Sequence, residues 1–271
     1  KSLHDLIFMA ILDDDADSLQ NLIIKNKINI NDPINVNYWI PSESNKNNSP
    51  IVYSIILGSI KCFKFLLLNT EDIDYPSLFK LAILGKNKEI YKIIEQKIDL
   101  TYTPIDYIKY AIQFMNNELL DYYIQKRHCY LGPTDINNCI YSSNYYAMLS
   151  LKKCNIYSSI NIAGTNGSTP IDTAAFEGEL YFVKFLFEVL GVNTHVLNSY
   201  GKTILQSAVK SNQIEIVKYI IKNNLVDVHD IGKWSLRPLD MAYFFGYDEM
   251  IVYLNKIIFK NGRTYFGHGK K

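Results

Sequence analysis

Two short clusters in the sequence carry ion-binding or reactive side chains. The first, 13–17, reads Asp-Asp-Asp-Ala-Asp and is similar to the start of a calcium-binding loop. An EF-hand loop needs Gly at its sixth position and Glu at its twelfth, but counting from Asp13 these positions hold Ser18 and Ile24. The calcium motif therefore fails. We interpret the acids as caps in a turn that precedes a helix.

The second cluster places a base beside a thiol, at His128 and Cys129. Adjacent residues rarely point at each other, so we do not expect catalysis there. The histidines never occur four residues apart, and no cluster has zinc-ligand spacing. The motifs GxxxxGK[ST], GxGxxG and GxSxG are absent. We expect no enzyme activity, no cofactor and no metal. An enzyme stays an open hypothesis only if the fold surrounds His128 and Cys129 with a polar cleft and an acid.

The composition is that of a folded chain with balanced charge. Of 271 residues, 48% are hydrophobic and 20% are charged, which is enough apolar surface for a core. The net charge is +1, which argues against nucleic-acid binding by the whole chain. The longest uncharged apolar run, 51–60, is too short to cross a bilayer. Four cysteines without CxxC spacing favour a reducing compartment. We expect an intracellular, cytoplasmic monomer that binds neither nucleic acid nor membrane.

The elements that position the side chains of this protein follow from a sequence repeat that runs along the whole chain. Eight small residues each have a bulky apolar residue three positions earlier, and others nine and twelve positions later. The small anchor residues are Ala10, Ser54, Ala82, Ala111, Cys139, Ala174, Ala208 and Ala242. A spacing of three places two residues on one helix face, and turn formers such as Gly58 and Gly178 separate the two helices. The pattern predicts helix–turn–helix units that stack into one core.

The last three units carry a more specific pattern. Residues 167–178, GSTPIDTAAFEG, are similar to the ankyrin pattern G-x-T-P-L-H-x-A-A-x-x-G, and 202–208 and 237–242 are weaker copies. The anchors of these units are 34 residues apart, close to the ankyrin period of 33. The chain thus resembles the ankyrin repeat family over nearly its whole length. The resemblance implies an all-α, ankyrin-like α-solenoid of about eight repeats, with short β-turn fingers mainly in the C-terminal half.

Two features depart from the family pattern. The histidine of the TPLH motif, which ties neighbouring ankyrin repeats by hydrogen bonds, is replaced by Asp172, Gln206 and Asp240. We expect these side chains to act as polar substitutes. The middle anchors, from Ser54 to Cys139, are only 28 or 29 residues apart. Helix pairs in this part should therefore have short loops and few fingers, as in divergent ankyrin-like repeats.

The spacings predict one ankyrin repeat domain over 1–271. Divergent short repeats occupy 1–160 and near-standard repeats occupy 161–257. The first interval is 44 residues, and its excess falls in an Asn- and Ser-rich stretch near 31–49, which we interpret as an inserted loop. Residues 258–271 are interpreted as a basic tail or cap.

The resemblance also implies a function. Ankyrin stacks usually bind a protein partner on their concave face, which finger tips and the exposed sides of the first helices line. Counting from the anchors, the predicted partner-binding residues are Phe176, Glu177, Tyr200, Lys202, Lys210, Lys233, Trp234, Leu236, Phe244 and Phe245. Exposed aromatic residues of this kind are typical of binding sites. Packing of the aromatic residues beneath the segment 257–266 is the alternative interpretation.

We therefore predict a non-catalytic protein-interaction scaffold. The alternative function is a regulatory or targeting module of a larger enzyme, kinase or channel. It is motivated by the start of the chain at Lys1, without an initiator Met.

Overall fold

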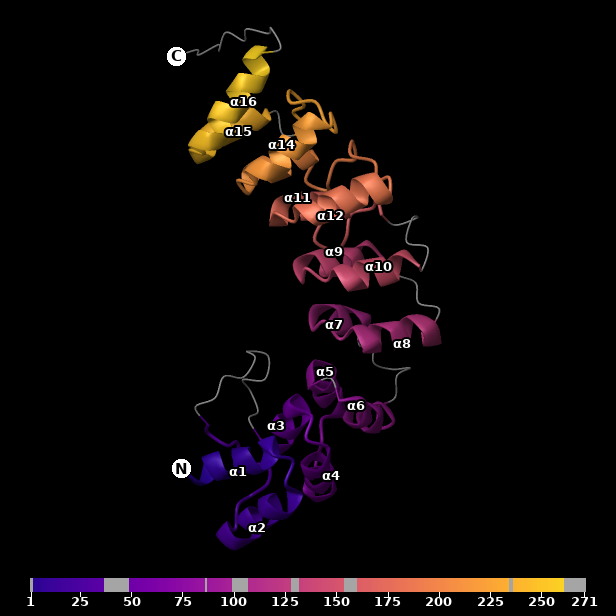
Figure 1. Cartoon of the computed structure of the whole chain (residues 1–271), viewed down its shortest axis with the longest axis vertical. Coiled ribbons are helices and arrows are strands. Elements are labelled where there is room, and N and C mark those ends of the chain that lie inside the picture. The colour runs from indigo at the N-terminus through magenta and orange to yellow at the C-terminus, as the bar shows by residue number, and fades with distance from the viewer. Residues whose placement is uncertain are drawn as a thin grey trace. The chain divides into compact units, whose positions relative to one another are not determined.

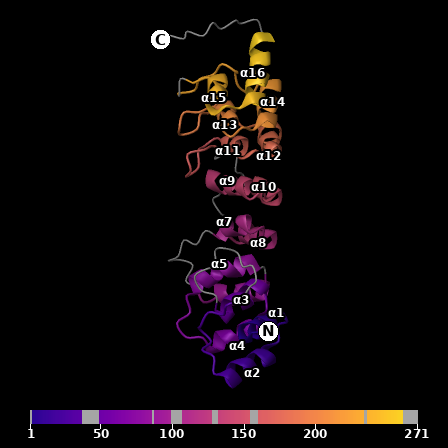
Figure 2. The ribbon, with the colours of Figure 1, turned by 90° about the vertical axis from the view of Figure 1, so that its left-hand side faces the viewer.

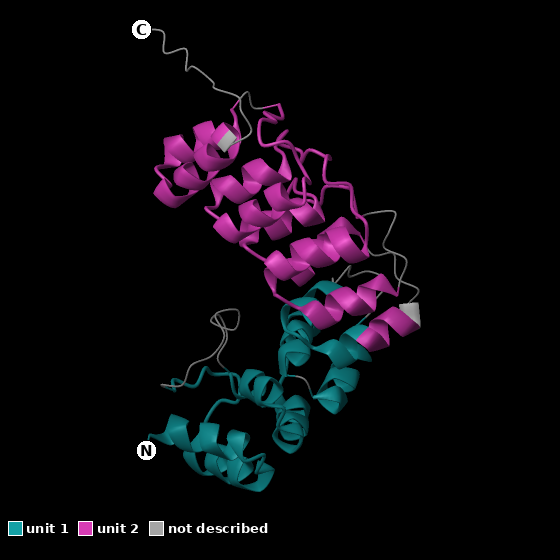
Figure 3. Cartoon of the chain, turned by 45° about the horizontal axis from the view of Figure 1, so that its top comes forward, with its two compact units in different colours: residues 1–120 teal, residues 121–271 magenta. Residues whose placement is uncertain are grey.

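The computed structural model describes residues 2–36, 49–85, 87–98, 107–127, 132–153, 160–233 and 236–260. Within these residues there are sixteen α-helices, one π-helical stretch and no strand. The chain divides into two compact units, residues 1–120 and 121–271 (Figure 3). A stack of repeats can divide into compact parts without forming separate domains. The single repeat domain therefore stays a prediction.

Unit 1 is a stack of helix pairs. Its helices are α1 (Leu3–Leu12), α2 (Ala16–Asn26), α3 (Pro50–Leu57), α4 (Ile60–Asn69), α5 (Tyr75–Gly85), α6 (Lys88–Glu95), α7 (Tyr107–Gln113) and the start of α8 (Asn117–Arg127), which ends in unit 2 (Figure 1). The first helices of successive pairs, α1, α3, α5 and α7, pack side by side. The second helices α2, α4 and α6 do the same. Each pair thus covers the apolar side of the next.

Unit 2 repeats this arrangement. Its helices are α9 (Pro133–Tyr141), α10 (Tyr145–Lys152), α11 (Pro170–Glu177), α12 (Leu180–Lys184) with its π-helical continuation η3 (Phe185–Val189), α13 (Ile204–Lys210), α14 (Ile214–Lys222), α15 (Pro238–Phe245) and α16 (Asp248–Lys260). Figure 2 shows α9, α11, α13 and α15 in one layer and α10, α12, α14 and α16 in a second layer. The sixteen described helices form eight pairs. The prediction of an all-α, ankyrin-like solenoid with eight repeats is confirmed.

The repeat positions form the core. All eight anchor residues are buried, and the most exposed of them, Ala10, is 7% exposed. Tyr123, twelve residues after its anchor, is completely buried. Leu22 in the first repeat, and Leu239 and Ile251 in the last, are only half-buried. A terminal repeat has a neighbour on one side only, so its apolar positions are covered less well.

The acidic run at 13–17 caps helices, as predicted. The carboxylate of Asp15, the N-cap residue of α2, accepts the backbone N–H of Ser18 over 3.0 Å. Asp14 caps a helix of the next repeat. Its carboxylate accepts the backbone N–H groups of Lys61 and Cys62, over 2.9 and 3.0 Å, in the first turn of α4. The sequence did not predict this link between repeats.

Replacing Asp14 with Ala should lower the free energy of unfolding by about 1–2 kcal/mol, because two N-terminal amides of α4 lose their acceptor. Urea denaturation followed by circular dichroism measures the loss. Asp13→Ala is the matched control, since the Asp13 side chain is exposed in the same turn. Equal losses for the two variants would contradict the capping role of Asp14.

The predicted loops and the predicted C-terminal tail can be compared with the structure only in part. The linker 70–74 between α4 and α5 is short, as predicted for a repeat without a finger. Most of the predicted insertion near 31–49 lies outside the described residues, as does the pair 128–129. At the C-terminus, α16 continues to Lys260 instead of ending before residue 258. The helix continues because Ile258, one turn after Leu254, keeps the apolar spacing and is buried.

Candidate protein-binding surface

Unit 2 has finger turns beside its first-helix layer (Figure 2). The fingers 164–168 and 198–202 are each closed by a backbone hydrogen bond between their first and last residues, of 2.9 and 3.1 Å. The two fingers are joined by the N–H of Ser199, which donates to the carbonyl of Gly167 over 2.8 Å. Lys233 makes the equivalent bond of 2.8 Å to a glycine carbonyl of the second finger. These bonds hold successive fingers in a fixed register.

Two glycines let side chains of one finger lie against the main chain of the preceding finger. Gly167 has φ of 79°, and a Cβ there would lie 3.1 Å from the ring of Tyr200. Gly201 has φ of 76°, and a Cβ there would lie 2.6 Å from the Cβ of Lys233. The hydroxyl of Tyr200 also donates to the carbonyl of Asn166 over 3.1 Å. The side chains of Tyr200 and Lys233 therefore pack against the main chain of the preceding finger, at Gly167 and Gly201.

Asp172 links α11 to the second finger. Its carboxylate is in a side chain only 2% exposed. It accepts a 3.0 Å hydrogen bond from the Nδ2 of Asn198 and a second one from the hydroxyl of Ser207. The Oδ1 of Asn198 accepts the backbone N–H groups of Tyr200 and Lys202, both over 3.0 Å. Asp172 thus acts as the predicted polar substitute for the TPLH histidine.

The same position serves other repeats. The Nε2 of Gln206 donates to the carbonyls of Ile231 and Leu236, over 3.0 and 2.7 Å. One repeat before Asp172, the Nδ2 of Asn137 donates to the carbonyl of Ser168 over 3.3 Å. Sequence reasoning missed Asn137, although it too stands two residues before a small anchor residue. A polar residue at this position therefore ties each of these repeats to the next finger.

Asp240 departs from this series. Its carboxylate accepts two hydrogen bonds of 2.8 Å from the Nε and a terminal nitrogen of Arg237, at the start of α15. These hydrogen bonds from Arg237 hold the pKa of the Asp240 carboxyl below its usual value, against the opposing effect of partial burial. Asp240 therefore stabilises its own helix start and not a following finger.

The sign of the pH dependence follows from that pKa. A carboxyl with a lowered folded-state pKa stabilises the fold above its unfolded-state pKa and loses this contribution as pH falls through the folded-state value. Asp240→Asn should therefore destabilise the chain at pH 7, and the difference from wild type should shrink towards about pH 3. Urea unfolding at a series of pH values measures it. A difference independent of pH would contradict the ion-pair role.

The structure brings several predicted residues of the first helices together. The ammonium of Lys210 lies 5.7 Å from the centre of the Phe176 ring. The carbonyl of Lys210 accepts a hydrogen bond of 3.2 Å from the hydroxyl of Tyr247. The ring of Tyr247 stacks on Phe245 at 5.6 Å, and Phe245 meets Phe244 edge to face at 5.1 Å. One strip of side chains thus crosses three repeats.

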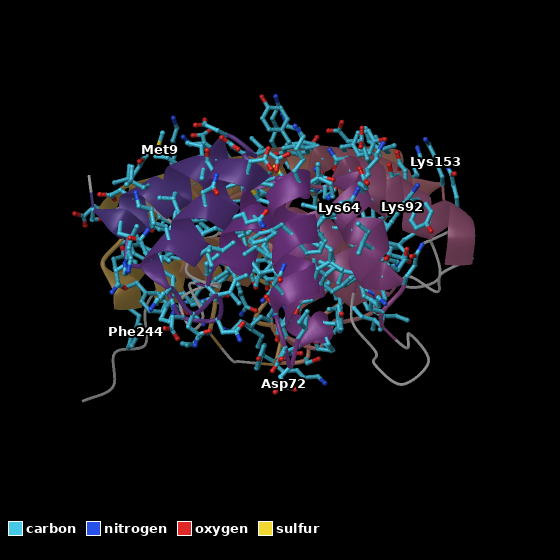
Figure 4. All side chains as sticks on the ribbon, turned by 90° about the horizontal axis from the view of Figure 1, so that it is seen from below. Met9, Lys64, Asp72, Lys92, Lys153 and Phe244 are labelled. Atoms are coloured by element: carbon cyan, nitrogen blue, oxygen red, sulfur yellow. The ribbon has the colours of Figure 1, made fainter. Side chains whose placement is uncertain are left out.

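We use the name finger face for the exposed residues of this strip together with Tyr200 and Lys233 of the fingers. The finger face consists of Phe176, Tyr200, Lys210, Lys233, Phe244 and Phe245. Phe244 is 80% exposed, and Figure 4 shows it pointing away from the ribbon. Sequence reasoning missed Tyr247, which joins Lys210 to Phe245 in this strip. The only signal for it was its place directly after the turn glycine Gly246.

The other predicted residues differ in their placement. Glu177 and Leu236 are exposed, as expected for a contact surface. Lys202 is only 6% exposed, so the expectation of an exposed side chain is wrong for this residue. Its backbone N–H, at the last residue of the second finger, donates to the Oδ1 of Asn198. Trp234 lies outside the described residues, as does most of the segment 257–266 that was considered as a cover for the aromatic residues.

Three features of the described residues concern metal binding, membrane spanning and thiol reactivity. No three His, Cys, Asp or Glu side chains of these residues are grouped so that they could hold a metal ion. None of the described helices combines the length and apolar character needed to span a membrane. Cys62 and Cys139 are buried free thiols. Burial, with a smaller contribution from the nearby Asp14, raises the pKa of Cys62 to about 12. That thiol therefore stays protonated at neutral pH.

The repeat geometry and the finger array are those of a known class. A family model for ankyrin repeats in three copies matches residues 108–231 and 174–261. These overlapping matches cover more than half of the chain. The chain therefore belongs to the ankyrin repeat family. Ankyrin repeats generally mediate protein–protein interaction, and the family is typically non-catalytic.

Two curated proteins show where similar sequences occur. An ankyrin repeat protein of fowlpox virus (strain NVSL) is 23% identical over 270 residues, which cover 86% of this chain and 44% of the viral protein. The alpha-latroinsectotoxin of Latrodectus tredecimguttatus is 32% identical over 77 residues, which cover 28% of this chain and 5% of the toxin. The chain thus spans less than half the length of either relative.

Proposed function

We propose that this chain is a non-catalytic scaffold that binds a protein partner on the concave face of its repeat stack, with the finger face as the contact surface. One observation carries the proposal. Phe176, Phe244 and Phe245 are exposed, yet they are joined into one strip through Lys210 and Tyr247. Exposed aromatic side chains in one patch are typical of binding sites.

The rigidity of the surface strengthens this proposal. Finger positions are fixed by main-chain bonds between neighbouring fingers and by the buried side chains of Asp172 and Gln206. A surface that is already ordered loses little conformational entropy when a partner binds. The aromatic residues would then act as anchors within a polar rim that includes Glu177 and Lys233.

The proposal also covers the oligomeric state of the chain, its cellular compartment and the ligands that it does not bind. The chain acts as a monomer in the cytoplasm, with no cofactor and without binding nucleic acid or membrane. The buried free thiols of Cys62 and Cys139 fit a reducing compartment of this kind.

A pull-down from native lysate tests the contact surface. Wild-type chain is compared with the double variant Phe176→Ala, Phe244→Ala, both exposed on the finger face. The control is the double variant Tyr181→Ala, Val252→Ala, because these side chains are 74% and 69% exposed on the second-helix layer. We expect wild type and control to capture the same protein and the finger-face variant to lose about tenfold or more, since buried aromatic anchors contribute 2 kcal/mol or more.

Circular dichroism must show all three baits equally folded. Equal capture by wild type and the finger-face variant would contradict the proposed surface. Capture by none of the folded baits would favour the alternative, a regulatory or targeting module that acts on a domain of its own polypeptide.

A further inference from the structure

Unit 1 contains an open groove that is separate from the residues of the finger face. The groove has a volume of about 750 Å³ and runs along the starts of α3 and α5 and the linker between α4 and α5. In unit 2 the finger 198–202 precedes the first helix α13, whereas in unit 1 the linker 70–74 leads directly into α5. Because this linker carries no finger, the groove beside it stays open. A groove of this size can hold a few side chains of another molecule.

The walls of the groove are apolar. They are formed by Ile51 and Val52 of α3 and by Leu78 and Leu81 of α5. The first three of these side chains belong to the core, while Leu81 is half-buried. The packing of α3 against α5 therefore fixes both walls. An apolar side chain that enters the groove is buried against a surface that is already ordered, which lowers the entropic cost of binding.

The rim of the groove is acidic. Glu71 and Asp72 are exposed in the linker, and neither has a hydrogen bond or ion pair with another described residue. Figure 4 shows Asp72 projecting from the ribbon. Asp74, also on the rim, accepts hydrogen bonds from the first turn of α5. Among the described lining residues the only base is Lys80, whose ammonium lies 4.8 Å from the centre of the Tyr110 ring. The rim therefore has a net negative charge, which attracts cationic groups.

We propose that this groove binds a basic segment of a protein partner. An apolar side chain of that segment lies between α3 and α5, and a neighbouring Lys or Arg lies at Glu71 and Asp72. The arrangement joins apolar burial to charge complementarity, which together give an interface its specificity. A metal ion fits less well, because no three His, Cys, Asp or Glu side chains of the described residues are grouped to hold one. The inference goes beyond the proposed function, since the groove belongs to unit 1 and the finger face to unit 2.

Selection of phage-displayed random peptides tests this inference. The bait is the whole chain carrying Phe176→Ala and Phe244→Ala, so that the groove is intact while the finger face is weakened. We expect enriched peptides to carry Lys or Arg next to an aromatic or aliphatic residue. Enrichment of peptides without a basic residue, or no enrichment at all, would overturn the inference. Neither result would touch the proposed function, which the pull-down with the finger-face variant decides separately.

Charge variants of the rim give a second readout, with a synthetic peptide from the selection as the probe. Glu71→Gln, Asp72→Asn removes two exposed carboxylates, and Asn tolerates the φ of 53° at position 72. This rim variant should bind the peptide about tenfold more weakly, and its Kd should depend less on salt. The matched control is Asp13→Asn, Asp17→Asn, which removes two exposed carboxylates near the start of α2. The control should change the Kd by less than about twofold.

Three outcomes of these measurements would overturn the groove as the binding site. The first is equal binding of the peptide by the rim variant and the control. The second is about tenfold tighter binding by Trp39→Ala, Ile40→Ala, at positions outside the described residues, because the chain's own segment would then be the occupant. The third is a concentration-dependent dimer that the rim variant abolishes, which would identify a second copy of the chain as the occupant.

Discussion

Replacing Asp172 with Ala is expected to lower the free energy of unfolding by about 3–5 kcal/mol. The carboxylate is 2% exposed and accepts hydrogen bonds from Asn198 and Ser207, which are themselves buried. Removing it leaves two buried donors without their acceptor, and each such group costs about 1–3 kcal/mol. It also removes a negative charge that opposes the lowering of the Lys202 pKa, a lowering caused mainly by burial.

The same change should loosen the second finger. Asn198 holds the backbone N–H groups of Tyr200 and Lys202, and Asp172 holds Asn198. Hydrogen exchange in the finger 198–202 should therefore become faster in the variant before the helices unfold. Asp248→Ala, at an exposed position in the first turn of α16, is the control and should change stability by less than about 1 kcal/mol. An Asp172→Ala variant as stable as this control would contradict the account of the repeat interface.

The second large effect is expected at Gly85, where α5 approaches α3. A Cβ added to Gly85 would lie 2.0 Å from the carbonyl oxygen of Ile55. Both groups belong to backbone, so the clash is relieved only if the helices move apart. Gly85→Ala should therefore cost about 2–3 kcal/mol, the upper part of the range for overpacked cores. The absence of a side chain at Gly85 is therefore what allows α5 to pack closely against α3 at this point.

Gly132→Ala provides the matched control for this prediction. Gly132 is the N-cap residue of α9, with φ of −107°, and an added Cβ there meets no atom within 4 Å. Its replacement should cost less than about 1 kcal/mol. Urea unfolding of both variants separates the effect of close packing from the general effect of replacing a glycine. Equal losses would show that the contact between Gly85 and Ile55 is not tight.

Much of the fold could be predicted because it depends on local spacing. The offsets of three, nine and twelve residues around each anchor follow from helix geometry, and they identify residues such as Phe63 and Leu186, which are completely buried. The fingers were predicted from the difference between intervals of 28 and 34 residues. Because the same spacing recurs in every repeat, a repeat with a weak pattern can be recognised from the positions of the repeats before and after it.

The contacts between repeats could not be predicted in the same way. Asp14 caps α4, although 47 residues separate it from Lys61. Such a pair depends on the register of one helix pair against the next, which the spacing within a unit does not determine. The burial of Lys202 has the same origin, because the position of the finger decides whether its side chain is covered. Predictions of single surface residues are therefore weaker than predictions of the core.

Site-specific photocrosslinking tests the proposed surface most directly. A benzoylphenylalanine is placed at Phe244 in one sample and at Tyr181 in another, since these are exposed aromatic positions on the two opposite layers. After irradiation in native lysate, the account predicts a covalent adduct with a second protein from position 244 and none from position 181. Adducts from position 181 alone, equal adducts from both, or none from either would contradict a partner-binding surface at the finger face.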